Sequence, residues 1–332
     1  MKAILPVAGV GTRLRPHTHT QPKALVHVAG KPILGHILDR LSPVGVDEVI
    51  LIVGQWGDRV AEYVRTAYPQ FKVIAIEQPE RKGLGHAVYM AREAVASEEP
   101  VLIVLGDTIF QADLRAALQR GCSTIGVRRV ADPRQFGVVE LEGDRVRRLV
   151  EKPADPPSDL AVVGIYYIRN SGLLFDCLRQ IVEEDIRVKG EYQLTDGLQR
   201  MIERGEPLYT FPVDNWWDCG NPATLLQTNR DLLALANPPV ADIPGSIIIP
   251  PVVIEEGVRI LHSVIGPYVS VAAGAEISNS IVRDSIINEG AVVFDSLLEA
   301  SLIGHRAVVR GTFTRLNIGD SSSLQLGGAP VE

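Results

Sequence analysis

Continuous apolar runs alternate with amphipathic segments through the first 110 residues. An apolar run without polar interruption is typical of a strand buried on both faces, and the segments between the runs have the spacing of helices. Repeated β-α-β order predicts an α/β domain with a doubly wound, mostly parallel, Rossmann-like sheet. The predicted strands are 3–5, 49–53, 72–76 and 101–105, and the predicted helices are 58–67 and 86–96.

The pattern changes after residue 124, where short alternating segments indicate antiparallel strands. Residues 137–141 and 145–150 flank a polar Glu-Gly-Asp turn, as in a hairpin. Helices are predicted at 171–184, 193–204 and 222–235, with a strand at 208–213. We therefore expect one α/β domain over residues 1–236.

A third pattern begins near residue 245, where charges become sparse and aliphatic residues recur every six positions. Ile265, Val271 and Ile277 are six apart, as are Ile287 and Val293. Such a hexapeptide repeat predicts a parallel β-helix over 245–326, in which each hexad supplies one inward aliphatic side chain. An irregular β-sandwich is the alternative. Residues 237–244, which include paired prolines, are the predicted linker.

Composition narrows the functional classes. The formal net charge of the 332 residues is -7, which argues against a general nucleic-acid binder. The three cysteines are far apart and lack C-x-x-C spacing, so neither a disulfide framework nor a zinc site is indicated. No apolar run approaches transmembrane length, and the start of the chain does not resemble a signal peptide. We expect a cytoplasmic protein that binds no membrane.

The first predicted strand leads into a loop suited to binding phosphate. Gly9 and Gly11 allow close backbone approach and unusual backbone angles, and exposed N–H groups in such a turn attract anions. Arg13 and Lys23 add positive charge, and the planar guanidinium matches phosphate oxygens. The spacing fits neither a Walker A loop nor a dinucleotide-binding fingerprint.

The whole segment, G-x-G-T-R-L-x-P-x-T-x-x-x-P-K followed by K-P, resembles the signature of the sugar-1-phosphate nucleotidylyltransferases. The resemblance covers essentially the full chain. It implies that the β-helix is left-handed, and that the loop binds a nucleoside triphosphate. The nucleotide-binding residues implied in this loop are Ala8, Gly9, Gly11, Thr12 and Arg13.

Two carboxylates are candidate ligands for Mg²⁺. Asp107 ends a buried strand as Leu-Gly-Asp, at the sheet edge where ligands bind in α/β folds. Asp218 lies in Trp216-Trp-Asp-Cys-Gly220, and the resemblance implies that it meets the same ion. Each aspartate has a structural alternative as a helix N-cap, before a helix at 112–119 or before the helix at Pro222.

The segment from Gln78 to Ala87 indicates the base-binding end of the site. A glutamine side chain donates and accepts hydrogen bonds, as reading a pyrimidine edge requires. Q-x-x-x-x-G-L-G-H-A resembles bacterial UDP-glucose pyrophosphorylases, which implies that Gln78 and Gly83 bind the base. His86 has no role beyond the start of the following helix.

The middle of the chain resembles long-form glucose-1-phosphate thymidylyltransferases instead, through segments 132–139, 149–153 and 158–164. For Glu151 and Lys152 the structural alternative is an exposed charged pair. The residues that this resemblance assigns to the sugar phosphate are Gly137, Glu151, Lys152, Gly164 and Glu191.

The implied reaction is Mg²⁺-dependent nucleotidyl transfer from dTTP or UTP to a sugar 1-phosphate, most simply glucose 1-phosphate. Arg13, Lys23 and Lys152 are the implied catalytic residues, acting by charge neutralisation. The exposed apolar corners of the β-helix predict a homo-oligomer. Two alternatives are an acyltransferase activity in the β-helix, with His262 or His305 as base, and a non-catalytic regulatory homologue.

Overall fold

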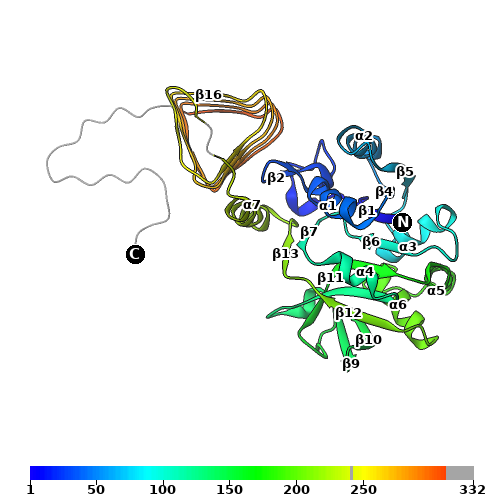
Figure 1. Ribbon diagram of the computed structural model, residues 1–332. Coiled ribbons are helices and arrows are strands. Elements are labelled where there is room, and N and C mark those ends of the chain that lie inside the picture. Colours follow the sequence, from blue (N-terminus) through cyan, green and yellow to red (C-terminus); the bar gives the residue numbers. More distant parts are fainter. Residues whose placement is uncertain (240–241, 312–332) are drawn as a thin grey trace.

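A nine-stranded sheet organises the N-terminal body of the protein (Figure 1). The structure is a computed structural model that describes residues 1–239 and 242–311. The strand order is β5-β4-β1-β6-β11-β8-β12-β10-β9. The strands are β1 Lys2–Pro6, β4 Glu48–Val53, β5 Lys72–Glu77, β6 Val101–Val104, β8 Ser123–Arg129, β9 Gly137–Glu142, β10 Arg145–Glu151, β11 Leu160–Ile168 and β12 Leu208–Pro212.

Helices cover both faces of this sheet, and the side chains of β1 show how. Ala3 and Leu5 are fully buried in a core shared with α1 and α2, whereas Ile4 points into the core formed with α3, α5 and α6. Successive side chains of a strand point to opposite faces of the sheet, so β1 contributes side chains to both hydrophobic cores. The helices are α1 Ile33–Leu41, α2 Gly57–Ala67, α3 Leu84–Met90, α4 Leu114–Gln119, α5 Ser171–Glu183, α6 Leu194–Glu203 and α7 Pro222–Ala236.

The description of the whole sheet as mostly parallel is wrong, whereas the antiparallel strands predicted after residue 124 are confirmed. The pairs β5–β4, β4–β1, β1–β6 and β12–β8 are parallel, whereas β6–β11, β11–β8, β12–β10 and β10–β9 are antiparallel. The hairpin β9–β10 has a two-residue connection, which only antiparallel strands can have. The domain is therefore a mixed α/β structure.

Between residue 245 and the last described residue, 311, the chain winds into a coil with three parallel four-stranded sheets, consistent with the predicted β-helix (Figure 1). Ser263 and Ser246 in successive coils are 17 residues apart, and Ser296 and Ser280 are 16 apart. The strands are β14 Ile247–Ile248, β15 Val252–Ile254, β16 Arg259–Leu261, β17 Val264–Ile265, β18 Val269–Val271, β19 Glu276–Ser278, β20 Ile281–Arg283, β21 Ile286–Ile287, β22 Val292–Phe294, β23 Leu297–Glu299, β24 Leu302–Ile303 and β25 Val308–Arg310.

The six-residue period correctly identifies the inward side chains of the coil. Ile265, Val271 and Ile277 lie one in each sheet and are at most 1% exposed. The next inward residue, Val282, follows after only five positions, because coils of 16 or 17 residues are shorter than three full hexads. The predicted end of the β-helix, 312–326, lies outside the described residues.

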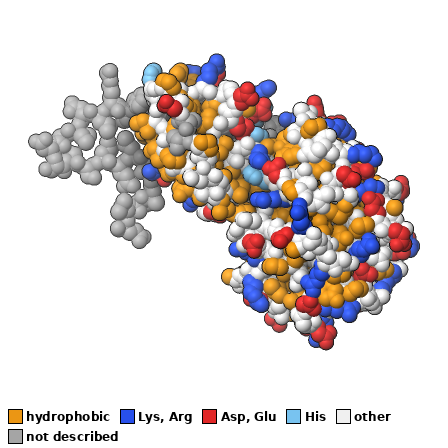
Figure 2. Space-filling model, in the orientation of Figure 1, with side chains coloured by type: hydrophobic (Ala, Val, Ile, Leu, Met, Phe, Trp, Pro, Cys, Tyr) orange, Lys and Arg blue, Asp and Glu red, His pale blue; other side chains and the backbone are white. Residues whose placement is uncertain are grey.

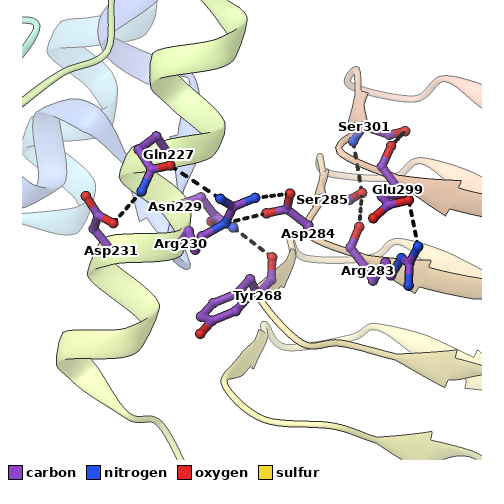
Figure 3. A network of polar contacts seen from close by, with 10 residues as sticks. All are labelled: Gln227, Asn229, Arg230, Asp231, Tyr268, Arg283, Asp284, Ser285, Glu299 and Ser301. Carbon is purple, nitrogen blue, oxygen red and sulfur yellow. Dashed lines mark hydrogen bonds and ion pairs between the residues drawn. The ribbon is translucent and has the colours of Figure 1, made fainter. Parts of the chain in front are cut away.

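Helix α7 joins the coil to the sheet domain through a network of polar contacts (Figure 3). Arg230 forms an ion pair with Asp284, and its Nε lies 3.0 Å from Oδ1 of that residue. The fully buried Asn229 donates to the Tyr268 carbonyl and accepts from the Ala29 amide and the Ser270 hydroxyl. The coil therefore docks on α7 and on the segment just after the signature loop. The exact domain boundaries stay a prediction.

No helix among the described residues is long and apolar enough to cross a membrane. Cys122, Cys177 and Cys219 are free thiols, as the sequence predicts. Burial raises the pKa of Cys219 to about 12, so this thiol stays protonated at neutral pH.

Candidate active site

A cavity of about 390 Å³ opens at the carboxyl ends of β1, β5 and β6. This is the edge where ligands bind in open α/β sheets. Seven predicted site residues line it, drawn from the first 191 residues of the chain. They are Ala8, Gly9, Lys23, Gln78, Gly83, Asp107 and Glu191.

The two glycines of the signature loop, Gly9 and Gly11, are required for different structural reasons. Gly11 has a φ of +65°, and its carbonyl accepts hydrogen bonds from the Leu14 amide and the Thr18 hydroxyl. This turn starts the 3₁₀ helix Thr12–Leu14, which bears the exposed Arg13. Gly9, in contrast, is not among the residues with positive φ. A Cβ at Gly9 would meet nothing within 4 Å, so the backbone faces open cavity there.

Lys23 meets Asp107 at the cavity wall. The largely buried ammonium lies 2.7 Å from Asp107 Oδ2. Asp107 lies between β6 and the short strand β7 (Thr108–Gln111), while Asp113 caps α4. The alternative that Asp107 is a helix cap is therefore wrong. Its carboxylate is instead part of the charged centre of the site.

Asp218 reaches this centre through strand pairing. Strand β13 (Asn215–Asp218) pairs with β7 so that Asp218 stands opposite Thr108, next to Asp107. Asn221 and Thr224 form the capping box of α7, so Asp218 is not a cap. Burial raises the pKa of Asp218, and the negative charge of Asp107 raises it further, against the opposing effects of Lys23 and Arg13.

Two adjacent carboxylates in a half-buried site are a fitting donor set for a divalent cation. The Arg13 guanidinium packs over Gly220, where a Cβ would lie 2.8 Å from Nη2 and from an Asp218 oxygen. Among the described residues, no group of three or more acidic, histidine or cysteine side chains is arranged to hold a metal. Two protein carboxylates suit Mg²⁺, which usually takes its other ligands from substrate phosphates and water.

Gln78, which was predicted to bind the base, follows β5 directly and is 6% exposed. The Gln78 amide nitrogen lies 3.0 Å from His86 Nδ1 and 3.4 Å from the Gly83 carbonyl. Burial lowers the pKa of His86, so the ring is neutral and accepts this hydrogen bond. His86 thus orients Gln78, a role that the sequence did not reveal.

Glycine is required at position 83 for the packing of the backbone, in addition to its predicted role in binding the base. Its φ is +107°, and a Cβ there would lie 2.6 Å from the Tyr192 carbonyl oxygen. The Gly85 amide donates to the same carbonyl at 2.8 Å. The glycines therefore let the cavity wall pack against the segment that carries Glu191.

Glu191 lines the cavity, whereas the other predicted sugar-phosphate residues do not. Gly137 pairs with Glu151 across β9 and β10, and Glu151 accepts a hydrogen bond from Thr195 at 2.6 Å. Lys152 Nζ lies 3.5 Å from Glu151 and is partly exposed. None of these lines the cavity. Gly164 reaches it only indirectly, since its carbonyl accepts from the amide of the cavity residue Leu105.

The sequence analysis missed Arg81, which lines the same cavity. Arg81 lies in the variable stretch between Gln78 and Gly83, where the motif specifies no residue type. The sequence did contain a signal for it. Arg81 is a charged residue within the predicted base-binding segment, and no nearby helix pattern explains its charge.

Comparison with known proteins agrees with this geometry. The sequence profile of the nucleotidyl transferase family matches residues 2–234. The chain belongs to this family. A glucose-1-phosphate thymidylyltransferase of Streptomyces griseus is 32% identical, over 98% of this chain and 99% of that protein. The low-salt glycan biosynthesis nucleotidyltransferase Agl11 of Haloferax volcanii is 31% identical, over 98% and 100% of the two chains.

Two solved structures have a fold similar to most of this chain. UDP-glucose pyrophosphorylase in complex with UDP-glucose matches with a TM-score of 0.62 at 24% identity, covering 70% of this chain and 98% of that one. A putative glucose-1-phosphate thymidylyltransferase from Bacillus anthracis matches with a TM-score of 0.61 at 25% identity, covering 73% and 98%. This chain is thus a nucleotidyltransferase with an additional C-terminal coil.

Proposed function

We propose that this nucleotidyltransferase transfers a nucleotidyl group from dTTP or UTP to glucose 1-phosphate, releasing pyrophosphate. The observation that carries the proposal is the meeting of Lys23, Asp107 and Asp218 beside the signature loop. Relatives named glucose-1-phosphate thymidylyltransferase, matched over nearly the whole chain, support the same substrates.

The chemistry needs positioning more than covalent participation. A phosphate oxygen of the sugar 1-phosphate attacks the α-phosphorus in line; the new P–O bond forms as the bond to the β-phosphate oxygen breaks, and pyrophosphate leaves with that electron pair. Arg13 and Lys23 neutralise the triphosphate during this step. Lys23 must exchange Asp107 for phosphate, which an ion pair at a cavity wall permits. Lys152 balances the sugar phosphate, with Glu151 and Gly137 toward the sugar.

Asp107 and Asp218 are the residues that would hold Mg²⁺. Burial raises the pKa of Asp218, and the nearby Asp107 charge raises it further; a bound divalent cation would stabilise both carboxylates in their charged form. When bound, the ion would neutralise charge on the α-phosphate oxygens.

The Gln78 side chain would read the pyrimidine. Its amide nitrogen is engaged by His86 and Gly83, which leaves its oxygen to accept from the N3–H group that uracil and thymine share. The two bases differ by one methyl group, and a pocket discriminates such a difference by only ~1–3 kcal/mol. Use of both nucleotides is therefore expected.

The test is pyrophosphate release with Mg²⁺, across dTTP, UTP, GTP, CTP and ATP against glucose, N-acetylglucosamine and mannose 1-phosphates. Turnover with dTTP or UTP and glucose 1-phosphate supports the proposal. Turnover only with other pairs would overturn the substrates but keep the reaction. A folded protein inactive with every pair would favour the regulatory alternative.

The coil would serve assembly, as a left-handed β-helix. Ile247, Ile281 and Leu297 are 61%, 47% and 78% exposed and lie on the single sheet β14-β17-β20-β23. Figure 2 shows hydrophobic side chains gathered on the visible surface of this lobe. A face of this kind favours self-association. Light scattering of Leu297→Glu against the wild type tests this, since dissociation is expected only for the variant.

His262 and His305 lie outside the candidate active site, and coenzyme A turnover tests the acyltransferase alternative.

A further inference from the structure

A second hollow of about 200 Å³ lies against the signature loop, on the side where the loop meets the start of α2. It shares three lining residues with the first cavity: Ala8, Gly9 and Arg81. The two spaces therefore adjoin across the backbone of the loop, at the glycine whose missing side chain leaves open space. The other lining residues are Val10, Arg15, Thr18, His19, Gln21, Pro22, Gln55 and Trp56.

Two arginines line this hollow without any partner. Within the described part of the chain, neither Arg15 nor Arg81 takes part in an ion pair or a side-chain hydrogen bond, whereas the neighbouring Arg59 donates to the Thr20 carbonyl at 2.6 Å. The hollow has no acidic lining residue. Two uncompensated guanidinium groups beside backbone N–H groups create a positive potential suited to a polyphosphate.

The proposed reaction produces such an anion, pyrophosphate, next to the signature loop. In-line displacement requires pyrophosphate to depart on the side of the α-phosphate opposite the sugar phosphate. Three of the predicted sugar residues, Gly137, Glu151 and Lys152, lie on or directly after β9 and β10, which do not adjoin β1 in the sheet. We propose that Arg81 and Arg15 bind the β- and γ-phosphates, and hence the leaving pyrophosphate, in the second hollow. This inference rests on the proposed function and adds two residues to it.

Arg81 lines both spaces, so its guanidinium reaches the departing phosphates from the side of the first cavity, while Arg15 reaches them from within the second hollow. Pyrophosphate and the triphosphate should therefore depend on both arginines. Nucleotide sugar, which lacks the departing phosphates, should depend on neither for its affinity.

The test is the reverse reaction of the full chain, with dTDP-glucose or UDP-glucose, pyrophosphate and Mg²⁺. Arg81→Gln and Arg15→Gln should each raise the KM for pyrophosphate by about tenfold or more, as expected for losing a charge-assisted hydrogen bond. The KM for the nucleotide sugar should change less than about twofold. Arg65→Gln, an exposed arginine on α2 outside both cavities, is the matched control and should leave both constants unchanged.

An unchanged KM for pyrophosphate in both variants would overturn the inference, as would an equal rise in both constants. Arg81→Lys should recover part of the affinity if charge at this position is what binds. Wild-type protein that forms no triphosphate from any nucleotide sugar would instead contradict the proposed function itself. Equilibrium titration with dTMP and dTTP gives an independent readout: only dTTP should bind more weakly to the variants.

Discussion

The sheet domain and the coil bury aliphatic side chains to the same degree but assemble them differently. In the coil each inward residue packs on its equivalent one turn away, at a separation of 16 or 17 residues. In the sheet domain, Lys23 meets Asp107 across 84 residues, and Asp218 joins them from the far end of the domain.

This difference separates stability from chemistry. A local repeat builds a regular core, and its buried members are aliphatic, so the coil offers little to a substrate. Long-range pairing places unlike groups together, including two carboxylates that repel each other. We expect substitutions in the two regions to affect different measurements.

The largest expected effect is on catalysis. Asp218→Asn removes one candidate metal carboxylate without changing side-chain size, and kcat should fall about 100-fold or more. The free energy of unfolding should not decrease, because the substitution removes a carboxylate whose charged form is disfavoured by burial and by the neighbouring Asp107. Asp176→Asn, at an exposed position on α5, is the control and should keep full activity. A loss below about tenfold for Asp218→Asn would contradict the metal-binding role.

The coil should show the opposite behaviour. Ile277→Ala leaves a cavity at a position 1% exposed, and should lower the free energy of unfolding by ~2–5 kcal/mol. Specific activity measured below the unfolding transition should stay unchanged. Ile281→Ala, at a position 47% exposed, should cost less than about 1 kcal/mol in the same urea titration. Lost activity in folded Ile277→Ala would show that the coil contributes to the site.

Substitutions at two glycines of the same cavity, Gly9 and Gly83, should distinguish an effect on nucleotide binding from an effect on stability. Gly9→Ala adds a methyl group in open space, so only the KM for the nucleotide should rise. Gly83→Ala combines a φ of +107° with a 2.6 Å approach to the Tyr192 carbonyl, and should also destabilise the fold by about 1–3 kcal/mol. Thermal unfolding and substrate titration of both variants make the comparison. Equal melting temperatures would contradict it.

The smallest effect is expected at the junction of the two regions. Arg230→Met removes the ion pair with Asp284 (Figure 3), and because the arginine is partly exposed, the cost should be about 1 kcal/mol or less. Asn229→Ala is the stronger companion, since it leaves buried hydrogen-bonding groups of the coil and of Ala29 without partners. Urea unfolding should rank Asn229→Ala above Arg230→Met. The reverse order would show that the ion pair dominates the junction.

The sequence by itself determined the features that depend on local pattern. Buried strands such as 49–53 are uninterrupted apolar runs in the sequence, and the coil is indicated by its six-residue repeat. The signature loop indicates the family from a single stretch of residues. Each of these is encoded within a few tens of residues, where periodicity and turn chemistry act directly.

Only the tertiary structure decided the rest. The pairing of β7 with β13 brings Asp218 to Asp107 and rules out the helix-cap alternatives for both. The alternating pattern after residue 124 indicated antiparallel strands, but not their partners: β11 pairs with β6 on one side and β8 on the other, and this joins both halves into one mixed sheet. Arg81 and Arg15 became notable because both lack partners around one hollow, and a property of neighbours in space is not written in the order of residues.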